Sequence, residues 1–200
     1  MSDRRSQPPV LIVHGIWDSR ARVSALELGL LTRGVDRVHA FDLKPNDGRA
    51  PIAALAQQVS RQADALVAEH GGGPIDLVGF SMGALVSRYY LQRLGGKERV
   101  RRFISISGPH QGTLVAYALP FAGLRDMRPG SALIRDLEAD TAGFGDVEVH
   151  CLYTPYDLMI VPATSSVLTG AKSVQRLAIP IHRMMITHRA SLDAVAALLR

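Results

Sequence analysis

Apolar residues recur along this chain with two different spacings, and the alternation between them predicts the order of its elements. Near-continuous apolar runs of about four to eight residues are typical of strands that are buried on both faces of a sheet. Apolar residues three and four positions apart indicate helices with one buried side. The runs expected to form strands are 9–14, 38–43, 75–78, 100–107, 147–153 and 173–179.

Segments with helical spacing separate these runs. The clearest helix begins at Pro51, a residue favoured at the first helical position, and ends at the glycines that start with Gly71. The region 113–146 contains no strand pattern and holds at most two short helices, near 114–120 and 131–138. Three further helices are expected around residues 23–30, 82–94 and 192–199.

Strands that alternate with helices indicate a three-layer α/β/α sandwich around a mostly parallel sheet of about six strands. Two hundred residues suit one domain, so we expect a flexible N-terminal tail at 1–8 and a single domain at 9–200. Ligands of such sheets bind at the carboxyl ends of the strands. Functional residues should therefore follow a strand rather than precede it.

The composition indicates a globular protein and the kind of compartment in which it is found. Hydrophobic residues make up 47% of the chain and charged residues 20%, which is enough to build one substantial core. No apolar run approaches the ~18 residues of a membrane span. The single cysteine, Cys151, excludes an internal disulfide and fits a reducing compartment. We therefore expect a cytoplasmic protein in which Cys151 is an inert core thiol.

The net charge of +5 comes almost entirely from arginine. Arginines cluster at Arg4 and Arg5 and again between Arg99 and Arg102, a pattern that could serve a nucleic acid or an anionic membrane. However, the clusters are short, contain no interleaved aromatic residues and are mixed with 18 acidic residues. We expect solvated arginines at element ends, no nucleic-acid partner and at most a transient contact with a membrane surface.

The stretch from Gly79 to Gly83 reads G-x-S-x-G and stands between a buried strand and a helix. This is the context of a nucleophile elbow, in which a serine oxygen protrudes from a sharp turn and the flanking glycines prevent a Cβ clash. An ordinary glycine-rich turn can carry the same letters by chance. In an elbow, Ser81 is the nucleophile, and the Met82 N–H at the positive end of a helix faces the developing oxyanion.

A serine nucleophile needs a base that takes its proton and an acid that orients the base. On this type of sheet they follow in the order serine, acid, histidine. Asp157 comes directly after the run 147–153 and is the best placed acid, with a role in the turn at Pro155 as the alternative.

Only two histidines, His182 and His188, follow Asp157. A last strand at 173–179 puts His182 just past the carboxyl edge of the sheet, because Pro180 ends the hydrogen-bonding ladder. A last strand at 181–186 puts His188 there instead. The pattern alone leaves both open.

A second oxyanion donor should come from a loop after another strand. Gly15 permits a sharp exit from the first strand, and Ile16 can then point its N–H inward. We expect His14 to hold this loop by hydrogen bonds at the edge of the substrate site, and His110 to be a loop or pocket-wall residue. The chain contains none of the common metal-binding or phosphate-binding motifs, so no metal and no cofactor are expected.

These segments together resemble the α/β-hydrolase superfamily and, within it, the compact bacterial lipases and esterases. The likeness extends from Val10 over nearly the whole chain, and its pieces are together more specific than the elbow alone. The matching segments are 13–16, 79–83, 108–113, 126–131, 157–161 and 170–174.

The resemblance implies a minimal α/β-hydrolase fold without a large lid, and it favours His182 over His188, since the family's histidine follows the strand after the glycine–alanine turn. The chain departs from the family pattern at Phe80, Ala84 and Ile181, which affects substrate preference more than the reaction. Residues 114–130 are the expected wall of the acyl pocket. The site residues that the resemblance implies are Ser81, Asp157 and His182 for the triad and Ile16 and Met82 for the oxyanion. We also expect five residues around the substrate, namely His14, Trp17, His110, Leu114 and Phe121, although 114–130 could instead pack against the sheet edge.

We therefore expect a serine carboxylesterase or lipase-like hydrolase that acts on a small-molecule ester or a lipid. An acyltransferase or a thioesterase would use the same residues with a different acceptor or leaving group. A binding protein of the same fold that catalyses no reaction is the alternative outside the enzymes. The presence of all three triad candidates argues against it.

Overall fold

The computed structural model describes residues 7–140 and 143–200. Residues 1–6, which make up most of the predicted tail, lie outside the described residues. The strands are β1 (Val10–Val13), β2 (Val38–Ala40), β3 (Ile75–Phe80), β4 (Val100–Ile106), β5 (Glu148–Tyr153) and β6 (Ser173–Arg176). The α-helices are α1 (Arg20–Leu31), α2 (Ile52–Glu69), α3 (Met82–Arg93), α4 (Ala122–Asp126), α5 (Ala132–Ala139) and α6 (Arg189–Leu199). The 3₁₀ helices are η1 (Gly96–Glu98), η2 (Leu114–Tyr117), η3 (Ala163–Ser166) and η4 (His182–Ile186).

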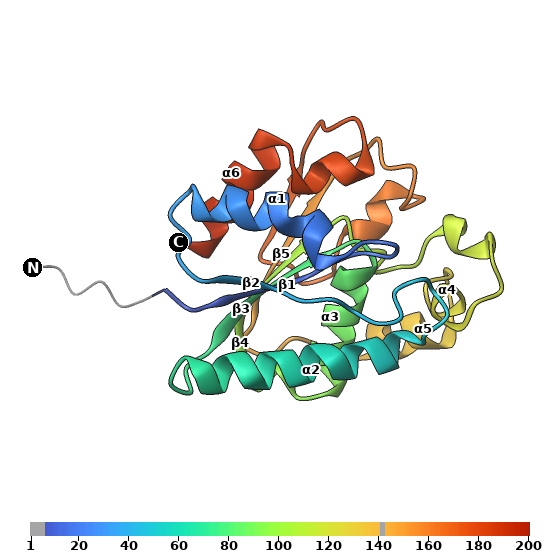
Figure 1. Ribbon diagram of the computed structural model, residues 1–200. Helices are drawn as coiled ribbons and strands as arrows, with labels where there is room; N and C mark the ends of the chain where they lie inside the picture. Colours follow the sequence, from blue (N-terminus) through green and yellow to red (C-terminus); the bar gives the residue numbers. More distant parts are fainter. Residues whose placement is uncertain (1–6, 141–142) are drawn as a thin grey trace, which may run out of the picture.

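The six strands form one parallel sheet in the order β2-β1-β3-β4-β5-β6. Helices α1 and α6 cover one face, and α2 and α3 cover the other (Figure 1). Alternate residues of β1 belong to different cores: Leu11 and Val13 pack with α2 and α3, whereas Val10 and Ile12 pack with α1 and α6. The predicted three-layer sandwich with a parallel sheet is confirmed.

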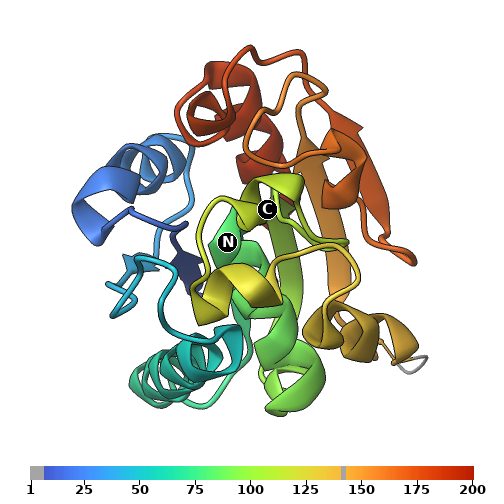
Figure 2. The ribbon, with the colours of Figure 1, turned by 90° about the vertical axis from the view of Figure 1, so that its right-hand side faces the viewer.

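The strand order decides where a ligand can reach the sheet. The chain runs outward from β1 to β2 and then returns to place β3 on the other side of β1. In open sheets of this type the crevice at such a reversal, beyond the carboxyl ends of the strands, is the binding site. The segment 114–130 crosses in front of this edge (Figure 2). The loops that follow β1 and β3 are therefore the first place to look for chemistry.

Strands β2 and β6 end well before the residues that the sequence predicts. Strand β2 ends at Ala40 rather than at residue 43, because the Leu43 N–H donates to His14 Nε2 (3.0 Å) and not to a neighbouring strand. Strand β6 ends at Arg176 rather than at residue 179, although the Leu177 N–H still donates to the Tyr153 carbonyl (2.8 Å). The alternative last strand at 181–186 is wrong, since this segment contains the 3₁₀ helix η4.

The region 113–146 contains one short helix more than expected. Besides η2 and α5 it forms α4, a helix of five residues that is too short to leave a period in the sequence. Contacts distant in sequence hold it: the Gly123 N–H donates to the Gly48 carbonyl (2.9 Å), and Asp126 Oδ2 accepts from the Ile52 N–H (2.9 Å). Asp126 thus satisfies the first N–H of α2, which its own N-cap, Pro51, leaves without a side-chain acceptor.

Cys151 lies buried in β5 as a free thiol, as predicted. Burial raises its pKa to about 11, so the sulfur is uncharged near neutral pH. Among residues 7–140 and 143–200, no helix combines the length and the apolar composition needed to cross a membrane.

The approach of α3 to β1 gives a test of the fold. A Cβ on Gly83 would lie 2.3 Å from the Val13 carbonyl oxygen and 2.4 Å from that of His14. Both are backbone atoms, so Gly83→Ala should lower the free energy of unfolding by about 3 kcal/mol or more, as measured by urea denaturation. Gly73→Ala is the control, since no heavy atom lies within 4 Å of its Cβ position. Equal stability of the two variants would contradict this packing.

Candidate active site

Ser81 occupies a strained turn between β3 and α3. Its backbone has φ 55° and ψ −127°, a region that side chains with a Cβ rarely adopt. The Ser81 N–H donates to the Ile106 carbonyl at the end of β4 (2.9 Å), which fixes the turn to the neighbouring strand. The turn therefore has the geometry of an elbow that presents the serine side chain beyond the carboxyl edge of the sheet.

Glycines allow the turn to be this tight. A Cβ on Gly79 would lie 2.6 Å from the Cα of Ala84, so only glycine lets the strand and the helix cross here. A Cβ on Gly15 would lie 3.0 Å from the Cβ of Ser81. The loop after β1 consequently lies directly against the serine.

Asp157 and His182 form a buried pair after the ends of β5 and β6. Asp157 Oδ2 lies 2.7 Å from His182 Nδ1, and the two side chains are 1% and 10% exposed. The second carboxylate oxygen accepts from the N–H groups of Met159 and Ile160, both at 2.9 Å. The imidazole ring also packs against Phe80, with ring centroids 4.8 Å apart. These contacts fix the orientation of the ring on both sides.

The environment of Asp157 keeps it ionised. Burial by itself would raise the pKa of this carboxyl. The hydrogen bond and charge interaction with His182, together with the two backbone N–H donors, outweigh burial and hold the pKa below the ordinary aspartate value. Asp157 is therefore a carboxylate that can accept the Nδ1–H of His182 at neutral pH.

Ser81 and His182 line one cleft of about 220 Å³. No hydrogen bond joins the two side chains in the described structure, and such contacts commonly tighten only when substrate binds. Three charged residues, Asp18, Arg22 and Arg183, contribute to the lining of this cleft. The lining residues are Gly15, Ile16, Trp17, Asp18, Arg22, Phe80, Ser81, Met159, His182 and Arg183.

Two residues beside Ser81, Ile16 and Met82, carry backbone N–H groups that could bind an oxyanion. The Met82 N–H is the first of α3, and the Ile16 N–H belongs to the loop after β1. Among residues 7–140 and 143–200, neither group has a hydrogen-bond acceptor, whereas the next N–H along, that of Trp17, donates to the Asn46 carbonyl (2.9 Å). Unpaired donors at a helix N-terminus and an adjacent loop are the arrangement that stabilises an oxyanion.

A separate apolar pocket also borders Ser81. Its walls come mainly from the segment 113–127 and from the loop that follows Asp157. We call it the acyl-side pocket. Its lining residues are Ile16, Trp17, Ser81, Met82, Pro109, Thr113, Val115, Ala116, Ala118, Leu119, Leu124, Met127, Met159 and Ile160.

Of the five residues expected around the substrate, the structure brings only Trp17 to the cleft and to the acyl-side pocket. His14 has no exposed surface: its Nδ1 donates to the Gly15 carbonyl (2.9 Å) and its Nε2 accepts from Leu43, which holds the loop. His110 lines a different cavity. Leu114 and Phe121 line neither the cleft nor the acyl-side pocket.

Thr113 and Met159 were missed by the sequence reasoning and help to form the pocket. Thr113 Oγ1 donates to the Met159 carbonyl and accepts from the Val161 N–H, both at 2.9 Å. The Leu114 N–H donates to the Val161 carbonyl (2.9 Å), and Leu114 is left 56% exposed. Phe121 packs against the core, with the Arg49 guanidinium 5.1 Å from its ring. No pattern within 113–121 signals these contacts.

The described residues contain no group of three or more histidine, cysteine, aspartate or glutamate side chains that could hold a metal ion.

Comparison with known proteins identifies the family. The sequence model of the palmitoyl protein thioesterase family matches residues 9–141, well over half of the chain. The chain belongs to the palmitoyl protein thioesterase family. The match includes Ser81, Ile16 and Met82 and ends before Asp157 and His182.

The fold of this thioesterase-family member is that of lipases and esterases. Lipase B of Aspergillus fumigatus superposes with a TM-score of 0.84 at 16% sequence identity, over 98% of this chain and 53% of the lipase. Mature lipase BlEst2 of Bacillus licheniformis superposes with a TM-score of 0.80 at 15% identity, over 98% of this chain and 93% of that protein. The predicted α/β-hydrolase fold is confirmed.

A curated relative carries a different name. "Probable oxidoreductase EphD" of Mycobacterium tuberculosis is 32% identical over 124 residues, which is 59% of this chain. The thioesterase-family member spans only 20% of the length of that protein. The name thus describes a much longer protein and says nothing of the chemistry at Ser81.

The ionised state of Asp157 makes stability depend on pH. Its folded pKa lies below the unfolded value of about 3.9, so the carboxylate stabilises the fold above that pH and loses this contribution as the pH falls through the folded pKa. Asp157→Asn should therefore lose less free energy of unfolding than the unmodified protein between pH 7 and about pH 3, measured by urea denaturation at each pH. The control is Asp36→Asn, at an exposed position. If Asp157→Asn and the unmodified protein lose stability in parallel, the carboxylate is not held as described.

Proposed function

We propose that this chain hydrolyses acyl esters through a triad of Ser81, His182 and Asp157. The observation that carries the proposal is the buried 2.7 Å contact between Asp157 and His182, beside a cleft that His182 shares with Ser81. A carboxylate on Nδ1 selects the tautomer in which Nε2 is free to accept a proton. The strained turn at Ser81 supports the same assignment.

The reaction follows from these positions. Ser81 Oγ attacks the acyl carbonyl while His182 Nε2 takes its proton, and the carbonyl oxygen becomes an oxyanion between the Ile16 and Met82 N–H groups. Collapse of the tetrahedral intermediate breaks the bond to the leaving group, which receives the proton from His182. Water, deprotonated by the same histidine, then releases the acid from Ser81. Each oxyanion donor should contribute on the order of 10²–10³ in rate.

The two spaces beside Ser81 suit the two halves of an ester. The acyl-side pocket has almost wholly apolar walls, which favours a hydrocarbon chain. The cleft at His182 carries Asp18, Arg22 and Arg183, which favours a polar leaving group. We propose that the acyl chain occupies the first space and the leaving group the second.

A thioester is the second candidate substrate, and the family match favours it, because the matched residues 9–141 include the elbow. A thiol has a pKa of about 8.5 and leaves readily as the thiolate, whereas an alcohol is far less acidic and needs the proton from His182. Thioester cleavage should therefore depend less on the acid role of His182 than oxygen-ester cleavage does.

The triad has a direct test. Ser81→Ala and His182→Ala should each lower the kcat for a p-nitrophenyl ester by about 10⁵-fold or more, and a fluorophosphonate should label the unmodified protein at Ser81. His188→Ala is the matched control: His188 caps α6 by accepting from the Ala190 N–H (3.2 Å), so its loss should cost about 1 kcal/mol of stability and little activity. Loss of activity in His188→Ala with activity retained in His182→Ala would overturn the assignment. Failure of the probe to label Ser81 would support a binding protein instead.

The substrate class needs a paired series. Acyl chains of increasing length are offered as oxygen esters and as thioesters, and kcat/KM is measured for each. Ala118→Trp should narrow the acyl-side pocket and lower kcat/KM for octanoyl relative to acetyl substrates at least about tenfold. Leu114→Trp changes a nearby exposed residue outside the pocket and should leave that ratio unchanged. A uniform preference for oxygen esters across the series would exclude the thioester candidate.

A further inference from the structure

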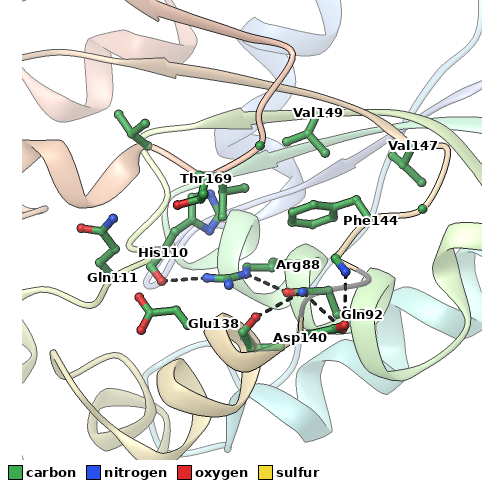
Figure 3. A pocket seen from close by; sticks show the side chains of 16 residues that line it. Arg88, Gln92, His110, Gln111, Glu138, Asp140, Phe144, Val147, Val149 and Thr169 are labelled. Atoms are coloured by element: carbon green, nitrogen blue, oxygen red, sulfur yellow. Dashed lines mark hydrogen bonds between the residues drawn. The ribbon is translucent and has the colours of Figure 1, made fainter.

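A second cavity, of about 630 Å³, lies away from Ser81, between α3, α5 and the segments that flank β5. None of its lining residues lines the cleft or the acyl-side pocket. The mechanism therefore makes no use of this space (Figure 3).

A buried guanidinium lies in its wall. Arg88 on α3 is only 5% exposed, and its Nε donates to Gln92 Oε1 and its Nη1 to the His110 carbonyl, both at 2.8 Å. Figure 3 shows the guanidinium between these two partners. Within the described part of the chain, no carboxylate lies within ion-pair distance of Arg88. Its Nη2 group makes no hydrogen bond there and is not fully buried, so it is accessible from the cavity. Burial lowers the pKa of Arg88 to about 10, so the side chain still carries its charge at neutral pH.

Burial of the Arg88 guanidinium lowers the stability of the fold unless a counter-ion balances its charge. A buried charge without a counter-ion is strongly disfavoured, and buried arginines are normally paired with carboxylates or phosphates. The neighbouring His110 supplies no charge, since burial holds its pKa well below the ordinary value, and its Nδ1 also has no partner among the described residues. The cavity thus exposes unpaired polar groups of Arg88 and His110, and the two carboxylates in its lining, Glu138 and Asp140, form no ion pair with Arg88.

The rest of the wall restricts the size and charge of a ligand. Phe144, Val147 and Val149 form an apolar side, and the exposed Thr169 lies at the mouth. Glu138 on α5 is close enough for its charge to act on Arg88, and Asp140 is already bound by Arg93. These acids disfavour a doubly charged anion such as phosphate. A guanidinium fork matches the two oxygens of a carboxylate.

We propose that this cavity binds a monocarboxylate with an apolar body, with its carboxylate on Arg88 and its hydrocarbon against Phe144 and Val149. A hydrocarbon acid of this kind fits both parts of the wall, whereas an uncharged lipid would remove the Nη2 donors from water without pairing them. Binding at this site does not require the reaction at Ser81, so an experiment can refute one proposal without refuting the other.

The test is calorimetric titration with octanoate at pH 7. Glu138→Lys, at an exposed position, replaces repulsion by attraction and should tighten binding about fivefold or more, whereas Thr169→Trp should block the mouth and abolish this binding event. Asp36→Lys makes the same change of charge at an exposed position near β2 and should have no effect. Arg88→Met should weaken binding at least tenfold. If that variant does not fold, the two surface variants decide the question.

Octanol and inorganic phosphate complete the experiment. Octanol lacks the charge, so any binding it shows should not respond to Glu138→Lys. The proposal is overturned if octanoate does not bind. It is also overturned if the Kd of octanoate is the same in the unmodified protein, Glu138→Lys and Thr169→Trp, because the ligand would then occupy the acyl-side pocket alone. Tighter binding of phosphate than of octanoate would also overturn it.

Discussion

The contact between the start of α3 and the end of β1 is the constraint on which the rest of the structure depends. Gly83 lies so close to the Val13 and His14 carbonyls that no side chain fits between them. This closeness forces the turn at Ser81 into positive φ and brings the loop at Gly15 against the serine. The energy of the two apolar cores on either side of the sheet holds this strain in place, which neither the turn nor the helix could do alone.

The second half of the site depends on loops rather than on the sheet. Asp157 and His182 lie 25 residues apart and follow different strands, yet the carboxylate is fixed by two N–H groups of its own loop. Thr113 in turn binds that loop from the opposite side. One hydroxyl therefore links the walls of the acyl-side pocket to the loop that carries the acid. A shift of this loop would alter chain accommodation and histidine orientation together.

The sequence predicts those elements whose apolar residues either recur at a helical spacing or form a continuous run. The stripe of α2 and the apolar runs of β1, β3, β4 and β5 each bury enough surface to leave a visible pattern, and the parallel sheet follows from their alternation. Single tertiary hydrogen bonds decide the rest, such as the bond from Leu43 to His14 that ends β2. The same holds for the site: chain order and strand ends indicate Ser81, Asp157 and His182, whereas Leu114 faces solvent because of a bond to Val161.

Helix α3 contributes both to the turn at Ser81 and, further along, to the second cavity. Its first N–H groups lie at the serine, where the helix dipole and an unpaired donor favour a developing negative charge. Two turns later the same helix carries Arg88, whose positive charge is buried against the loop that also supplies Pro109 to the acyl-side pocket. The bond from Arg88 to the His110 carbonyl fixes the residue that follows Pro109 in this loop. The buried cation and the turn at Ser81 are thus joined by one helix and one loop.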